Sequence, residues 1–275
     1  MMSRVIGIMQ GRLTPPIGNR IQAFPADRWR EEFPLAAQVR LGCIEWIYET
    51  YGHDQNPLCT DAGLAELRSL SERHGVTVRS VCADYFMEQP LIRAEGAELR
   101  RRSEHLRWLI SRCAAAGIRR IVLPFVDASE IRTSEDEPTV VDVLTEVEQI
   151  ATVAGVELHL ETSLAPRPFA ALLDRLPGSI RVNYDTGNSA SLGYSPTDEF
   201  AAYGDRIGSV HIKDRLRGGT TVPLGTGSAD FAAFSAAVRR VQYAGDLILQ
   251  AARGVMGQEL QWAQSNLHFV TEGLG

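Results

Sequence analysis

The segment Ala154-Gly155-Val156-Glu157-Leu158 ends a helix-like stretch and begins an apolar, strand-like one. Glycine tolerates the left-handed backbone that closes many helices, so this junction predicts a helix, a tight turn and a strand. The same punctuation recurs at His74-Gly75, Ala116-Gly117, Pro177-Gly178, Gly204 and Ala244-Gly245. Together with strand-like runs near residues 5–11 and 42–47, the repeat predicts eight strands.

Amphipathic stretches separate these strands, and we expect helices there. They cover about residues 27–40, 61–73, 94–116, 139–154, 168–176, 196–203, 229–241 and 257–272. Alternating strands and helices form either a closed barrel or a doubly wound sheet. No GxGxxG loop follows the first strand, which removes the main support for a dinucleotide-binding sheet. The sequence therefore predicts an α/β fold, a (β/α)8 TIM barrel, as a single domain over residues 1–275.

The composition limits which binding partners and which cellular compartment are expected. The net charge of −6 disfavours a nucleic-acid partner, because phosphate binding needs a basic face. The four cysteines show no CxxC spacing, so neither a zinc knuckle nor a disulfide framework is expected. We find no signal-peptide pattern and no apolar run long enough for a membrane span. A cytoplasmic location without a membrane partner is the expectation.

Polar residues end four consecutive later strands. Side chains alternate along a strand, so one parity points into a barrel. The inward set at the strand ends is expected to be Glu161, Asp185, His211 and Gln250. Two carboxylates, an imidazole and an amide oxygen suit a divalent ion such as Mn²⁺, Co²⁺, Mg²⁺ or Zn²⁺. These residues are therefore predicted to hold a metal at the carboxyl end of the barrel.

Several segments resemble the xylose-isomerase-like barrel superfamily, and within it the sugar-phosphate isomerase/epimerase branch. They are Met9-Gln-Gly-Arg-Leu13, Ile44-Glu-Trp46, Glu161-Thr162, Asn183-Tyr-Asp-Thr-Gly-Asn188 and His211-Ile-Lys-Asp-Arg215. The resemblance covers essentially the whole chain. It implies a metal on strands five to eight and proton transfer at carbons that flank a carbonyl. The function it implies is a metal-dependent isomerase or epimerase that converts a sugar, keto-sugar or sugar phosphate through an enediolate-type intermediate.

One position departs from the family pattern. Such epimerases usually carry Glu on strand eight, as a metal ligand and second acid/base, whereas this chain has Gln250. An amide oxygen can bind a metal, but an amide does not shuttle protons near neutral pH. Glu161 remains the expected proton-transfer group. The candidates for its missing partner are Glu45, Asp84 and Lys213.

Substrate contacts are expected from the loops that follow the strands. The candidates are Gln10, Arg12, Asp84, Asn188, Arg215 and Arg253. Arginine suits a carboxylate or phosphate because its fork binds two oxygens. Residues 218–227 are glycine-rich and are interpreted either as a phosphate cradle or, with more support, as a solvated loop. His159 is interpreted as a hydrogen-bonded core residue.

Three alternatives share the fold. A metal-dependent dehydratase or lyase on a keto-sugar or keto-polyol needs the same carbanion stabilisation, so the sequence leaves it open. An endonuclease-IV-like DNA repair enzyme needs many histidine ligands, and the chain has six histidines in all. A non-catalytic binding barrel would explain Gln250 but not the retained acidic residues. The expected partner is a small sugar-like molecule, and a homo-oligomer is compatible with the resemblance.

Overall fold

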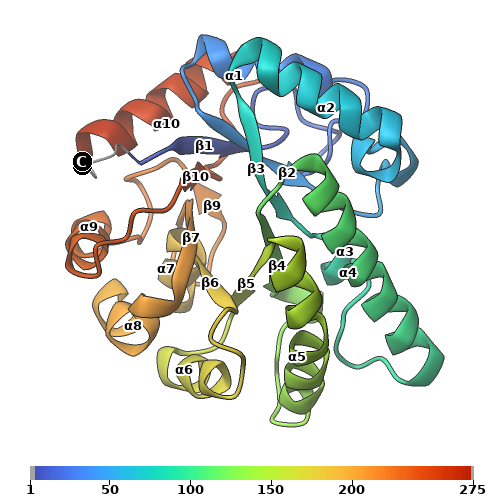
Figure 1. Cartoon of the computed structure of the whole chain (residues 1–275). Helices are drawn as coiled ribbons and strands as arrows, with labels where there is room; N and C mark the ends of the chain where they lie inside the picture. The colour runs from blue at the N-terminus through green and yellow to red at the C-terminus, as the bar shows by residue number, and fades with distance from the viewer. Residues whose placement is uncertain (1–3, 274–275) are drawn as a thin grey trace.

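The computed structural model describes residues 4–273, and its centre is a closed ring of eight parallel strands (Figure 1). The ring order is β1-β2-β3-β4-β5-β6-β7-β10, with β10 pairing back onto β1. The strands are β1 (Ile6–Met9), β2 (Cys43–Ile47), β3 (Thr77–Cys82), β4 (Arg120–Phe125), β5 (Glu157–Thr162), β6 (Arg181–Asp185), β7 (Ile207–Ile212) and β10 (Leu247–Leu249). The predicted (β/α)8 barrel is confirmed.

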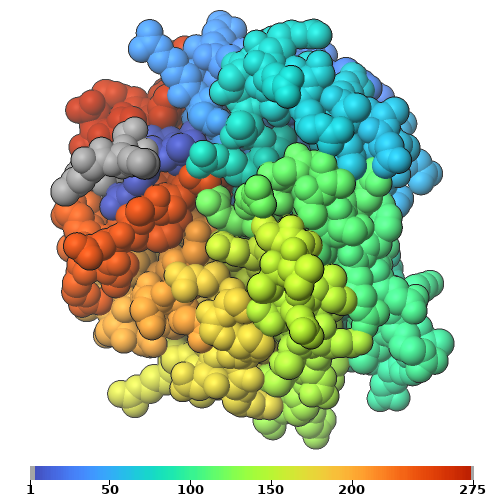
Figure 2. Space-filling model, in the orientation of Figure 1, coloured from blue at the N-terminus to red at the C-terminus, as the bar shows by residue number. Residues whose placement is uncertain are grey.

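Helices cover the outside of this ring. They are α1 (Glu32–Gln38), α2 (Asp61–His74), α4 (Gly96–Ala116), α5 (Asp136–Ala154), α6 (Pro166–Asp174), α8 (Pro196–Tyr203), α9 (Phe231–Arg240) and α10 (Glu259–Gly273). In Figure 2 the N-terminal segments, in blue, and the C-terminal segments, in red, lie side by side and complete the outer layer. None of the helices in residues 4–273 has the length and apolar character that crossing a membrane requires.

The prediction that a glycine in the left-handed conformation ends each helix is only partly confirmed. Gly75, Gly117 and Gly155 end α2, α4 and α5 in the left-handed region, with φ of 67°, 78° and 70°. Gly204 instead has φ of −60° and continues into a 3-10 turn. After α9 the left-handed residue is Gln242, with φ of 54°, and not the predicted Gly245. A short connection can therefore turn without glycine when packing holds it.

Several short elements at the carboxyl end were not predicted. They are α3 (Tyr85–Glu88), α7 (Thr186–Leu192), the hairpin strands β8 (Asp214–Arg215) and β9 (Thr221–Val222), and 3-10 turns at His53–Gln55, Pro57–Cys59 and Asp127–Ser129. Two further 3-10 turns lie elsewhere: Trp29–Glu31 falls within the helix predicted over residues 27–40, and Gly204–Arg206 precedes β7 at the amino-terminal end. Each is too short to show a hydrophobic period in the sequence. They lie mainly in strand-to-helix connections, which form the active-site face of this fold.

Candidate functional site

Three of the predicted metal ligands converge at the carboxyl end of the barrel. Glu161 on β5, Asp185 on β6 and His211 on β7 each place a ligand atom within 4.8 Å of the others. All three side chains are buried. Neighbouring parallel strands in register bring their ends to the same level, as Asp185 paired with His211 shows. Two buried carboxylates beside an imidazole are a donor set typical of a divalent-metal site.

Asp185 is held by the start of α7. Its Oδ1 accepts hydrogen bonds from the backbone N–H groups of Gly187 and Asn188, both at 2.8 Å, as an N-cap. Its Oδ2 accepts a hydrogen bond from Lys213 Nζ at 3.0 Å. A Cβ at Gly187 would come within 2.7 Å of Lys213 Cγ, so the glycine makes room for the lysine side chain.

His211 is oriented by a buried carboxylate on the far side of its ring. Its Nε2 lies 2.5 Å from Glu45 Oε1, and Glu45 also accepts a hydrogen bond from Ser80 Oγ. The opposite nitrogen, Nδ1, faces Glu161 Oε2 at 3.3 Å. Burial lowers the pKa of His211, but the charges of Glu45 and Glu161 outweigh it and raise the pKa to about 10. A carboxylate behind a histidine fixes which nitrogen points to a metal.

Glu161 is positioned by two amides. Asn183 Nδ2 donates to its Oε2 at 2.8 Å, and Asn188 Nδ2 donates to its Oε1 at 2.6 Å. Burial raises the pKa of this carboxyl, but His211 and Lys213 more than offset that effect and hold the pKa below its usual value. The carboxylate is therefore ionised and ready to bind a cation or take a proton.

Below this site a chain of hydrogen bonds crosses the barrel core. Ser209 Oγ donates to Asn183 Oδ1 at 2.7 Å and lies 2.7 Å from His159 Nδ1. His159 Nε2 in turn lies 3.0 Å from Glu157 Oε2 at the start of β5. TIM-barrel interiors are usually filled by branched apolar side chains, so this polar column is unusual. His159 is the hydrogen-bonded core residue that the sequence predicts.

Gln250 supplies the observation that tests the fourth ligand position. Its Nε2 donates to Gln22 Oε1 at 3.0 Å. Its Oε1 is buried and has no hydrogen-bond partner among residues 4–273. A buried acceptor without a donor costs free energy unless something else satisfies it. Because Gln250 lines the same cavity as Glu161, its orphaned oxygen fits a divalent ion bound there.

The site opens into a cavity of about 750 Å³ at the carboxyl end. Among the predicted substrate and proton-transfer residues, those that line it are Arg12, Asp84, Glu161, Asn188, Lys213 and Arg215, and the predicted metal ligand Gln250 lines it as well. Arg215 Nη1 donates to Asn188 Oδ1 at 2.9 Å, which links the β8 segment to the Glu161 side. A cavity of this size accommodates a small sugar-like molecule.

Three predicted residues take different places. Glu45 is fully buried beneath His211 and does not line the cavity. It therefore contacts the predicted metal ligand His211 and not a substrate. Gln10 is also fully buried, and its Oε1 accepts the N–H of Ile47 at 2.9 Å. Arg253 lies outside the cavity and donates to the carbonyl groups of Ile21 and Thr14. Substrate contact by these three is not supported by the geometry.

Arg12 reaches the cavity, but its guanidinium is committed to the loop between β1 and α1. It donates to the carbonyl oxygens of Ala251 and Ile21 and to Gln22 Oε1. Burial, together with the charge of Arg253, lowers the pKa of Arg12 to about 9. Arg12 and Arg253 therefore hold this loop over the barrel, which places Gln22 against Gln250.

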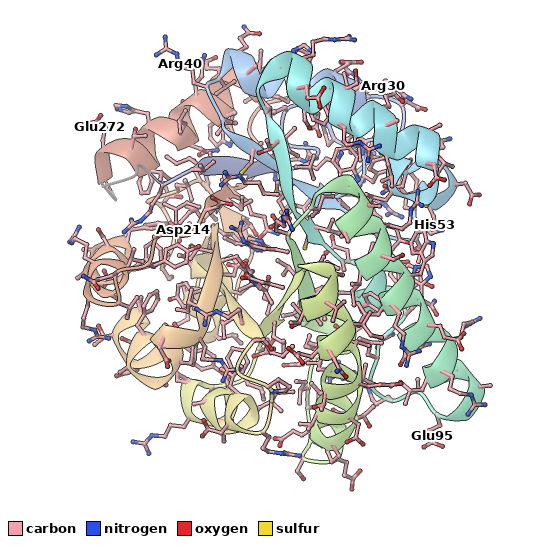
Figure 3. The ribbon with its side chains drawn as sticks, viewed as in Figure 1. Arg30, Arg40, His53, Glu95, Asp214 and Glu272 are labelled. Carbon is pink, nitrogen blue, oxygen red and sulfur yellow. The ribbon has the colours of Figure 1, made fainter. Side chains whose placement is uncertain are left out.

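The glycine-rich segment is solvent-accessible along its length, as the favoured prediction has it, but a carboxylate of the chain holds its backbone in place. The carboxylate of Asp214 accepts the N–H groups of Gly225, Gly227 and Ala229 at 2.8–3.0 Å. Those amides are the groups that a phosphate would need, so the internal carboxylate occupies the cradle. In Figure 3 Asp214 lies near the centre of the molecule, whereas Arg40, Glu95 and Glu272 project from its edge. The segment is thus an ordered hairpin.

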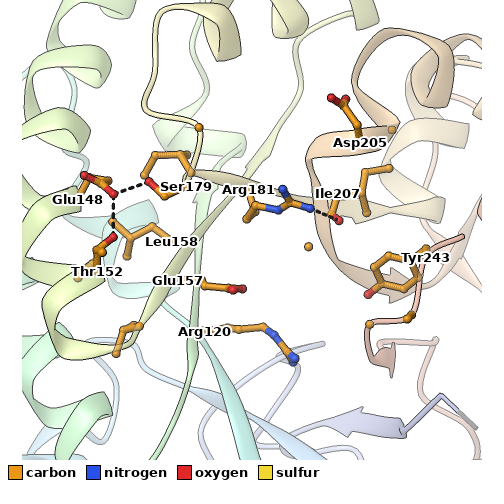
Figure 4. Close-up of a pocket in the computed structure, with 18 of the residues that line it drawn as sticks. Arg120, Glu148, Thr152, Glu157, Leu158, Ser179, Arg181, Asp205, Ile207 and Tyr243 are labelled. Atoms are coloured by element: carbon orange, nitrogen blue, oxygen red, sulfur yellow. Dashed lines mark hydrogen bonds between the residues drawn. The ribbon is translucent and has the colours of Figure 1, made fainter. Parts of the chain in front are cut away.

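A second cavity, of about 690 Å³, lies at the opposite end of the barrel (Figure 4). It is lined by the first residues of β4 to β7 and by the turns that precede them. Its polar groups are engaged: Ser179 and Thr152 both donate to Glu148, and Arg181 donates to the carbonyl of Ile207. Asp246 pairs with both Arg79 and Arg120 at the same end.

Sequence reasoning missed Gln22, Asn183 and Ser209. Asn183 shares the strand parity of Asp185, and Ser209 that of His211, so alternation was a usable signal for both. Gln22 gave no signal, because it comes from a long irregular loop whose path depends on Arg12 and Arg253.

Comparison with known proteins places this geometry in a family. A family model described as a xylose isomerase-like TIM barrel matches residues 33–271, and the chain belongs to that family. No curated protein matches it significantly by sequence.

Solved structures extend the comparison. The chain is similar to a D-psicose 3-epimerase from Clostridium cellulolyticum H10 with D-tagatose, with TM-score 0.79, 16% identity, and coverage of 98% of this chain and 99% of that one. It is similar to an L-ribulose 3-epimerase, with TM-score 0.74, 20% identity, and coverage of 99% and 95%. It is also similar to an IolI protein with a bound zinc atom, with TM-score 0.74, 17% identity, and coverage of 98% and 99%. Identities this low establish the fold alone.

Proposed function

We propose that this chain is a divalent-metal-dependent isomerase or epimerase that acts on a sugar, keto-sugar or sugar phosphate. The observation that carries the proposal is the convergence of Glu161, Asp185 and His211, together with the unpartnered Oε1 of Gln250, a residue that lines the same cavity as Glu161. The names of several structural neighbours, which are sugar epimerases, support the same class.

The metal would be held by Glu161, Asp185, His211 and Gln250. When bound, a divalent ion supplies a Lewis acid that polarises the carbonyl and the adjacent hydroxyl of a substrate. Because the fourth ligand, Gln250, is neutral, the ion has two carboxylate ligands and not three. More of its positive charge then acts on the substrate.

Protein groups carry out the remaining steps. Glu161 takes the proton from the carbon next to the carbonyl, with Asn183 and Asn188 holding its oxygens in place. Asp185 draws Lys213 Nζ over the mouth of the site, where the ammonium can hydrogen-bond a substrate hydroxyl. Glu45 keeps His211 in a single orientation through its ring nitrogen.

The proposal is tested by a screen of 2-ketoses, including D-psicose and L-ribulose, with their phosphate esters. The protein is loaded with Mn²⁺, Co²⁺, Mg²⁺ or Zn²⁺, the reactions are run in D₂O, and products are followed by NMR. We expect isomerised or epimerised product with deuterium at the carbon beside the carbonyl, and loss of this activity in Glu161→Gln. Stoichiometric metal binding with products of dehydration or carbon–carbon cleavage, or with no turnover, would overturn it.

A further inference from the structure

The proposed function leaves the second proton-transfer group unassigned, and the inference made here rests on that function. Inverting a carbon requires one group that removes a proton from one face and another that returns a proton to the opposite face. Glu161 can serve one face, whereas the amide of Gln250 cannot serve the other. Besides Glu161, the carboxyl groups that line the cavity are Glu49, Asp84, Glu88, Asp127 and Glu130.

Burial and partners separate these carboxyl groups. Glu88 and Asp127 are exposed and Glu130 is half-buried, so water surrounds them at the rim. Glu49 is buried, but it accepts the N–H of Phe24 and forms an ion pair with Arg20. Asp84 is 6% exposed, and both of its hydrogen-bond donors are neutral groups. Only Asp84 is therefore both shielded from solvent and free of a cation.

Asp84 also lies on the correct side of the barrel. It comes two residues after β3, which stands four places from β7 and two places from β5 in the ring of eight strands, so it approaches the mouth of the barrel from a different side than Glu161. The metal ligands lie on β5, β6, β7 and β10. A substrate bound to these ligands across the mouth of the barrel would present its other face toward β3.

A single loop side chain connects Asp84 with the amide on β10. Gln22 Nε2 donates to Asp84 Oδ2 at 2.7 Å, while its Oε1 accepts from Gln250 Nε2 at 3.0 Å. The second donor to Asp84 is the thiol of Cys82, 3.1 Å from Oδ1. Gln22 thus engages the N–H group of the Gln250 amide, whose oxygen is left without a partner, and holds the Asp84 carboxyl in the cavity.

We propose that Asp84 is the second proton-transfer residue and serves the face of the substrate opposite Glu161. Glu161 removes the proton from the carbon beside the carbonyl, and the C–H electron pair passes into the enediolate. The protonated Asp84 carboxyl then gives its proton to the same carbon from the other face. Glu161 ends protonated and Asp84 ionised, and exchange with solvent restores both groups before the next turnover.

The electrostatic surroundings of Asp84 suit an acid of this kind. Burial is the main cause that raises its pKa to about 6, and the charge of Glu161 acts in the same direction. The hydrogen bonds from Gln22 and Cys82 and the charge of His211 oppose the shift. Both protonation states are then populated near neutral pH, as general acid/base catalysis requires.

Asp84→Asn separates the two proton transfers, because Asn has the same shape but is neither an acid nor a base near neutral pH. With the ketose found active in the screen, we expect inversion to fall about 100-fold or more. Glu161 should still exchange the substrate proton for deuterium in recovered, uninverted ketose, within about tenfold of the wild-type rate. Metal affinity, measured by titration with Mn²⁺ alone, should be unchanged. Glu148→Gln, in the cavity at the opposite end of the barrel, is the control and should retain both reactions.

The outcomes distinguish this inference from the proposed function. Wild-type inversion in Asp84→Asn contradicts the role of Asp84 and leaves the function standing. Loss of exchange together with inversion, at unchanged Mn²⁺ affinity and melting temperature, also contradicts it, since Asp84 would then act in the Glu161 step. If Asp84→Asn does not fold, Asp84→Ser must show the same split. No turnover by the wild type overturns the proposed function and this inference with it.

Discussion

The two ends of the barrel hold cavities of similar size but different chemistry. The amino-terminal cavity is about 690 Å³ and the carboxyl-terminal one about 750 Å³. At the amino-terminal end, Asp246 pairs with two arginines and Glu148 accepts two hydroxyl groups. At the carboxyl-terminal end, carboxylates crowd one imidazole, and an amide oxygen is buried without a donor. Volume therefore says little about function, whereas unmatched buried charge indicates a binding site.

The two ends of the barrel should differ most in how Mn²⁺ affinity and activity respond when one carboxylate at each end is replaced by an amide. Asp185→Asn can still cap α7 but removes one of the two ligand charges. We expect Mn²⁺ affinity to fall by at least about 100-fold and activity to fall with it, because a direct ligand matters more than the groups behind it. Glu148→Gln makes the same change in the other cavity and should leave both unchanged. Titration calorimetry with each variant checks this, and equal effects at the two ends would refute the contrast.

A second pair of variants compares two carboxylate–histidine contacts. Glu45 contacts His211 at the carboxyl-terminal end, and Glu157 contacts His159 at the other. Glu45→Gln should weaken Mn²⁺ binding by about 10- to 100-fold, since it loosens the orientation of a ligand. Glu157→Gln should not change the affinity, because its side chain is 58% exposed and far along the polar column. A drop of equal size in Glu157→Gln would show that the column transmits its state to the metal site.

These contrasts also show what could be read from the sequence. Strand alternation sufficed for Glu161, Asp185 and His211, because a parallel barrel brings strand ends to one level. Glycine after a helix marked three turns correctly, but Gly178, Gly204 and Gly245 are not in the left-handed region. The roles of Arg12 and Arg253 were out of reach, because a loop's path depends on contacts distant in sequence. The same is true of Asp214, whose carboxylate fills a loop predicted to be solvated.

Gln250→Glu adds a third carboxylate at the carboxyl-terminal end of the barrel, which already holds Glu161 and Asp185, and so extends the comparison of the two ends. A third carboxylate should tighten Mn²⁺ binding by about tenfold, because affinity rises with the ligand charge count. It should also reduce the effect of the ion on the substrate, so turnover per bound metal should not rise. Gln250→Leu, which removes the oxygen at similar volume, should instead weaken binding. Calorimetry and a turnover assay on both variants decide it, and tighter binding in Gln250→Leu would rule out a ligand role for Oε1.

A last contrast concerns pH and a buried carboxyl beneath the loop that carries Gln22. Burial raises the pKa of Glu32 to about 7, although Gly11, Leu13 and Thr14 donate hydrogen bonds to it. Between the ordinary glutamate pKa of 4.5 and about 7, the unfolded chain loses this proton before the folded one. The free energy of unfolding should therefore fall as pH rises through that window, by about 3 kcal/mol relative to Glu32→Gln. Urea unfolding of both proteins at pH 4.5 and 8 measures it, and a constant difference between them would contradict it.

The central claim is that the carboxyl-terminal cavity holds a metal on three side chains and the Gln250 oxygen. Its most direct test is anomalous X-ray diffraction from crystals soaked in Mn²⁺. We predict one strong peak within coordination distance of Glu161, Asp185, His211 and Gln250 Oε1, and none in the amino-terminal cavity. A crystal that shows no peak at this site, or a peak with the Gln250 oxygen turned away from it, would contradict the account.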